Sequence, residues 1–143
     1  MSAVLTPELL QAADSFLDTD EQHQTASQLG ERLFEVFRAE EGRISTQVRN
    51  LQQMAMSATR FADVEDFVKN QMGRNAGAYQ EWRKVGDDIL GQLGELRKAA
   101  DGFVTDDGQR LLLRLHLVRG WVRAVVGAYL YTKAQKEMEQ SHA

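Results

Sequence analysis

The sequence predicts an all-α protein: a single compact helical bundle of about five to six helices, formed as one domain by residues 1–143. Three observations indicate this class. The chain contains one proline, Pro7, and 43% of its residues are apolar. Apolar residues also recur at steps of three and four along most of the sequence, which is the spacing of helices with one buried face. A chain of 143 residues can bury a core without disulfides, and residues 1–20 could be an N-terminal extension of the bundle.

Two helices are expected in the N-terminal third of the chain. Thr6, Pro7 and Glu8 supply a capping hydroxyl, a proline at the first helical position and a first-turn acid, so a helix should begin there. A second helix is expected from about Asp20 to Glu41. Its outer face is acidic, with Glu21, Glu31, Glu35, Glu40 and Glu41. That face is either simply solvated or a surface that repels phosphate or meets a basic neighbour.

The next segment, residues 42–74, predicts two shorter helices. Gly42 can end the preceding helix, and the hydroxyl of Ser45 or Thr46 can cap the following one. The apolar residues of that helix share one face, whereas Arg49, Asn50, Gln53 and Arg60 fall outside it. A further helix is expected over residues 64–72, with Asp63 as its cap.

The C-terminal half predicts two long helices, over about residues 78–100 and 109–136. Asp106 and Asp107 lie between them and could cap the second. This second helix contains no acid and is apolar on several sides. Its expected inner stripe is Leu111, Leu115, Val118, Val122, Val125, Val126 and Tyr129, with Leu112, Leu113, Leu117 and Trp121 outside it. Such a helix is either central in its bundle or shares a face with another chain, and we expect the first.

The net charge of −4 is unevenly distributed. Residues 1–41 carry nine acids and two bases, and residues 75–107 carry seven acids and four bases. Residues 42–74 carry five bases and three acids, and residues 108–143 carry six bases and two acids. A protein with separated charges can present a basic surface while it remains acidic overall.

Several classes of protein are disfavoured. The chain has no cysteine, so thiolate metal sites and disulfides are excluded. No histidine has a second histidine or cysteine at the spacing of metal ligands, and adjacent acids on a helix point apart. No dinucleotide-binding or Walker motif is present. We therefore expect neither a metal site, a cofactor nor catalysis. No apolar run could span a membrane and no signal peptide is evident, so we expect a cytoplasmic protein.

The segment from Gly42 to Arg60 is the strongest candidate for a binding site. Arg43 and Arg49 flank the start of a helix, where free backbone N–H groups favour anions. Together with amide side chains, these groups could bind phosphate without distinguishing the bases. The alternative is a capped amphipathic helix whose arginines are only solvated.

Two resemblances suggest functions. Arg110 and His116 resemble the Arg-x(4–6)-His spacing of HEPN ribonucleases, helical enzymes in which the pair cuts RNA at a dimer interface. The run from Ser45 to Asn50, STQVRN, resembles the small subunit of type III-A CRISPR effector complexes, the Csm small subunit. Met72-Gly73-Arg74 is similar to a second feature of that family, and residues 124–133 resemble its closing helix.

The CRISPR resemblance implies a non-catalytic helical bundle that stacks in several copies along the guide RNA–target RNA duplex and contacts its backbone. It would assemble with other subunits of a ribonucleoprotein and self-associate in a filament. The resemblance carries over Gln47, Arg49 and Asn50 from the first motif and Arg74 from the second. The charge pattern adds Arg43, Arg60, Lys69, Arg83, Lys84, Arg119 and Arg123.

Two other functions stay open alongside RNA binding. One is a protein–protein adaptor that uses the apolar last helix and the acidic N-terminal region. The other is the HEPN-like ribonuclease.

Overall fold

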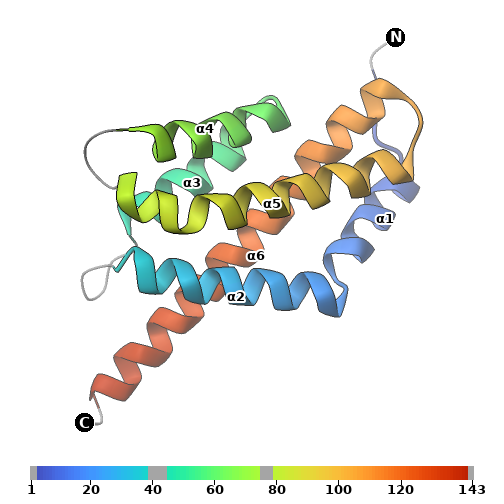
Figure 1. Cartoon of the computed structure of the whole chain (residues 1–143). Helices are drawn as coiled ribbons and strands as arrows, with labels where there is room; N and C mark the ends of the chain where they lie inside the picture. The colour runs from blue at the N-terminus through green and yellow to red at the C-terminus, as the bar shows by residue number, and fades with distance from the viewer. Residues whose placement is uncertain (1–2, 39–44, 75–78, 142–143) are drawn as a thin grey trace.

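The structure is a computed structural model that describes residues 3–38, 45–74 and 79–141. In this part of the chain all regular structure is helical, which confirms the all-α bundle (Figure 1). The helices are α1 (Pro7–Leu17), α2 (Asp20–Val36), α3 (Thr46–Ser57), α4 (Phe61–Gly73), α5 (Tyr79–Phe103) and α6 (Asp107–Ser141).

Helix α6 is the centre of the bundle, as expected from its apolar composition. It contacts each of the other five helices. Figure 1 shows it crossing the molecule diagonally, with its C-terminal end projecting past the other helices. Trp121 and Tyr129 are fully buried in it, and each such side chain contributes about 1.5–3 kcal/mol through burial.

The buried surface of α6 is wider than a single stripe. Leu113, Leu117 and Trp121, which lie outside the expected stripe, are all buried. Leu111, which was placed on the stripe, is instead 58% exposed. The cause is the number of neighbours, because all five other helices contact α6.

The helix boundaries confirm some expected caps and correct others. Thr6 Oγ1 accepts a hydrogen bond from Leu9 N at 3.2 Å, and Asp106 Oδ2 accepts one from Gln109 N at 2.8 Å. The expectation that Asp63 caps its helix was wrong, because α4 begins at Phe61 and Asp63 pairs with Arg60 at 2.7 Å.

Four further helix ends differ from the prediction. Helix α2 ends at Val36 rather than near Glu41, with Phe37 as its C-terminal cap. Helix α5 continues to Phe103, and α6 extends from Asp107 to Ser141. Gly42 and Ala78, expected at a helix end and a helix start, lie outside the described residues.

Two glycines allow helices to approach closely. A Cβ atom on Gly30 in α2 would lie 2.5 Å from Ala128 Cβ and 2.7 Å from the backbone nitrogen of Tyr129 in α6. A Cβ on Gly86 in α5 would lie 2.2 Å from the sulfur of Met72, so this glycine leaves room for that side chain of α4. At Gly91 and Gly94 of α5, by contrast, a Cβ would meet no atom within 4 Å.

In the described part of the chain, no helix combines the length and the apolar character that crossing a bilayer requires.

Candidate nucleic-acid interface

Three helix ends meet at one end of the bundle: the start of α3, the end of α4 and the start of α5. Trp82 Nε1 in α5 donates a hydrogen bond to Gln47 Oε1 in α3 at 2.8 Å. Arg83 Nε, the next residue of α5, donates to the carbonyl oxygen of Met72 in α4 at 2.9 Å. These two bonds fix the three helix ends relative to one another.

A cluster of aromatic side chains packs together at this junction. Trp82 is 1% exposed, and its ring centroid lies 5.7 Å from that of Phe67 and 5.1 Å from that of Phe37. Such contacts add about 0.5–1.5 kcal/mol each to the burial of the rings. Phe67 and Met72 pack on the core.

We name the five cations at this junction the basic end: Arg49, Lys69, Arg74, Arg83 and Lys84. All five side chains are exposed. Among residues 3–38, 45–74 and 79–141, those of Arg49, Lys69, Arg74 and Lys84 have no hydrogen bond or ion pair. Their charges are therefore not neutralised by described acids, and they can interact with an anion.

The start of α3 adds to the positive potential of the basic end. Ser45 Oγ caps the helix by accepting from Gln47 N at 3.2 Å, which confirms one of the two expected caps. The first turn of α3 contains no acid, so the positive end of the helix dipole is not offset there. Asn50 is exposed on the same helix, one residue after Arg49.

Gln47 has a structural role in addition to its predicted one. Its side chain is half-buried and holds the indole of Trp82. It was expected to contact RNA directly, but the structure uses its amide oxygen to join α3 to α5. Sequence spacing gave no signal of this bond, because 35 residues separate its partners.

The other predicted cations lie away from the basic end. Arg60, before the start of α4, pairs with Asp63, and the hydrogen bond from Arg60 lowers the pKa of that carboxyl. In α6, Arg119 donates to the carbonyl oxygens of Ala55 at 3.3 Å and Ala58 at 2.7 Å, and so caps the end of α3.

Two predicted residues remain. Arg123 is exposed and donates to the carbonyl oxygen of Arg119 in its own helix at 3.3 Å. Arg43 lies outside the described residues. Of the seven predicted arginines and lysines in or beside α3, α4 and α5, five therefore lie at the three helix ends that form the junction, and the two of α6 do not.

The residues of the ribonuclease resemblance do not converge. His116 Nε2 lies 2.9 Å from Asp14 Oδ1 in α1. Arg110 Nε donates to the carbonyl oxygen of Val104 at 3.0 Å, in the connection between α5 and α6. Each side chain has its own partner, so within one chain they form no common site.

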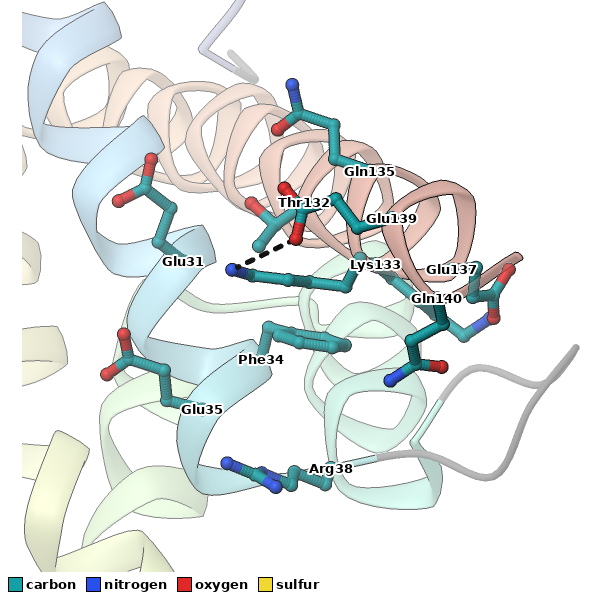
Figure 2. Close-up of a pocket in the computed structure, with 11 residues that line it drawn as sticks. Glu31, Phe34, Glu35, Arg38, Thr132, Lys133, Gln135, Glu137, Glu139 and Gln140 are labelled. Atoms are coloured by element: carbon teal, nitrogen blue, oxygen red, sulfur yellow. Dashed lines mark hydrogen bonds and ion pairs between the residues drawn. The ribbon is translucent and has the colours of Figure 1, made fainter. Parts of the chain in front are cut away.

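A groove lies between the end of α2 and the projecting part of α6 (Figure 2). Its volume is about 850 Å³. Acids and bases both line it: Glu31, Glu35, Glu137 and Glu139 with Arg38, Lys133 and Lys136. The mixed charge favours neither phosphate nor a metal ion, and the described residues contain no cluster of potential metal ligands.

The acidic outer face of α2 is partly confirmed. Glu21, Glu31 and Glu35 are exposed, whereas Glu40 and Glu41 lie outside the described residues. Comparisons of the chain with protein-family models, with curated proteins and with solved structures gave no match.

Proposed function

We propose that this chain is a non-catalytic RNA-binding subunit that contacts the sugar–phosphate backbone through the basic end. The observation that carries the proposal is the group of exposed, unneutralised side chains of Arg49, Lys69, Arg74 and Lys84 at the ends of α3, α4 and α5 that form the junction. Cations held on rigid helix ends bind phosphates without distinguishing the bases.

The expected affinity is weak and sensitive to salt. Each phosphate neutralised on a single strand contributes about 0.7 to the slope of log K against log salt. Four cations therefore give a slope of at most about 3. One copy would bind RNA weakly, and several copies on one strand would bind more tightly through their combined contacts.

The type III CRISPR small subunit is the particular role we propose. Two of the three sequence segments that resemble that family, Ser45–Asn50 and Met72–Arg74, belong to the junction that forms the basic end, and the third, residues 124–133, lies in α6. The hydrogen bonds of Gln47 with Trp82 and of Met72 with Arg83 bring them there. Base pairing between guide and target would supply sequence specificity in such a complex, and the subunit would hold the backbone.

Titration of the chain into fluorescently labelled single-stranded RNA of about 40 nucleotides, at low and moderate salt, tests the proposal. We expect weak binding that Arg49→Glu and Arg74→Glu each reduce. Lys98→Glu is the matched control, since Lys98 is exposed on α5 but lies 14 residues after Lys84, about 21 Å along the helix. Binding that all three variants reduce equally would indicate a nonspecific charge effect.

Absence of binding at low salt would favour the adaptor function, in which the chain contacts proteins alone. RNA cleavage that His116→Ala abolishes would favour the ribonuclease. The separate partners of Arg110 and His116 make this second result the less expected one.

A further inference from the structure

The C-terminal half of α6 carries an apolar face on the side opposite the bundle. At steps of three and four residues this face consists of Ala124, Gly127, Tyr131, Ala134 and Met138, and all are exposed. The exposed fractions of Tyr131 and Met138 are 66% and 61%. On the opposite side of the same turns, Val125, Val126 and Tyr129 are buried in the bundle. The pattern is that of a helix with two packing faces, of which the bundle covers one.

This face continues an interface that already exists within the chain. One turn earlier, Gly120 lies on the same side of α6, and a Cβ there would be 2.5 Å from Leu17 Cδ1 of α1. Helix α1 ends at Leu17. At Gly127, two turns further along α6, a Cβ would meet no atom within 4 Å. A helix is therefore packed on α6 up to Gly120, and the same face is bare beyond it.

We propose that a second copy of this chain covers the bare face, with the two α6 helices antiparallel about a two-fold axis. In this arrangement Tyr131 of each copy lies opposite Ala134 of the other, and Met138 lies opposite Gly127. Each large side chain thus enters the space beside a small one, as packing at helix interfaces requires. A parallel pair would instead place Tyr131 against Tyr131 and leave gaps at Gly127 and Ala134.

The charges are compatible with this pairing. No charged residue lies on the face itself, so two copies do not repel each other across it. At its edge, Arg123 is exposed beside Ala124. In the antiparallel pair Ala124 lies opposite Ser141 of the second copy, where the last carbonyl oxygens of α6 make the helix end negative. Arg123 of each copy therefore faces the negative helix end of the other copy, and this contact occurs twice in the symmetric pair.

The pairing is independent of the proposed RNA binding, because it uses α6 and none of the five cations of the basic end. Sedimentation of the full chain without RNA tests it. We expect a dimer at micromolar concentration that persists at high salt, since an apolar interface is not screened. A monomer at every concentration would overturn the proposal.

A residue exchange tests which side chains meet. Ala134→Tyr places two tyrosines opposite each other, and Tyr131→Ala leaves a gap, so each should weaken dimerisation about tenfold or more. The double variant, with both substitutions, restores one large and one small residue to each layer. We expect it to recover wild-type affinity within about threefold. Gln140→Ala, off the face, is the control, and failure of the double variant to recover would contradict the proposed layers.

Disulfide cross-linking tests the direction of the helices, because the chain has no cysteine of its own. Gly127→Cys mixed with Met138→Cys should cross-link under mild oxidation. Neither variant should cross-link alone, since identical positions lie about 16 Å apart along an antiparallel pair, beyond the reach of a disulfide. Cross-linking of each variant alone would indicate parallel helices and overturn the proposal.

Discussion

Gly30→Ala should destabilise the protein, although alanine is the better helix former. Glycine within a helix costs about 1 kcal/mol relative to alanine, so the local effect of this change in α2 is favourable. The tertiary effect opposes it. The new Cβ would lie 2.5 Å from Ala128 Cβ and 2.7 Å from Tyr129 N in α6.

The tertiary effect should be the larger one. Atoms of the α6 backbone cannot rotate away as the end of a flexible side chain can, so one helix must move relative to the other. Overpacking of this kind costs about 1–3 kcal/mol or more. Tyr129 is also fully buried, and its hydroxyl accepts a hydrogen bond from Ser45 N at 3.1 Å, so a shift of α6 disturbs the start of α3 as well.

Thermal and urea unfolding followed by circular dichroism measure the effect. We expect a net loss of about 1–3 kcal/mol, which at roughly 3 °C per kcal/mol lowers the melting temperature by about 3–9 °C for a chain of this length. Gly91→Ala in α5 is the matched control, because a Cβ there meets no atom within 4 Å. It should stabilise by about 0.5–1 kcal/mol. If Gly30→Ala also raised the melting temperature, the close contact of α2 with α6 would be refuted.

Three further predictions concern contacts between helices. Gln47→Leu leaves the indole N–H of Trp82 without its partner and should lower the free energy of unfolding by about 1–3 kcal/mol. Gln53→Leu, on the exposed side of α3, should change the free energy of unfolding little. Equal effects of the two variants in urea unfolding would contradict this role of Gln47. Arg119→Met removes the two hydrogen bonds that cap α3 and should cost about 1–2 kcal/mol, measured by the same assay beside Arg123→Met, which should cost less. Hydrogen bonds from Arg114 hold the pKa of Asp101 in the folded protein below its ordinary value of 3.8. The ionised carboxylate therefore stabilises the fold above pH 3.8, and this stabilisation is lost as the pH falls through the lower pKa of the folded state. Asp101→Asn should therefore reduce stability at neutral pH and flatten its decline in acid, and an unchanged acid profile would exclude the linkage.

Periodicity predicted the fold class, but it did not predict which sides of the central helix are buried. A stripe of three- and four-residue steps identifies one buried face, and α6 is buried on several because five helices contact it. Leu111 was therefore placed inside although it is exposed, and Trp121 was left outside the stripe although it is buried.

The candidate site shows a similar limit. Charge patterning located the basic segment that contains Arg49 and Arg74, but it treated every arginine alike. Whether an arginine caps a distant helix, as Arg119 does, depends on contacts between residues 61 or more positions apart. The bond between Gln47 and Trp82 has the same character, since no local pattern specifies which amide a buried indole will meet.

The position of α6 in the chain order has a consequence for how the protein is made. The helix that every other helix contacts is the one that follows them all in sequence. During synthesis, α1 and α2 remain without their main packing partner at least until the 70 residues from Phe37 to Asp106 have been translated. Contacts of such long sequence separation slow folding, and they leave apolar surface exposed in the meantime. The growing chain should therefore depend on chaperones, and ribosome-bound chains that stop before Asp107 should remain sensitive to protease.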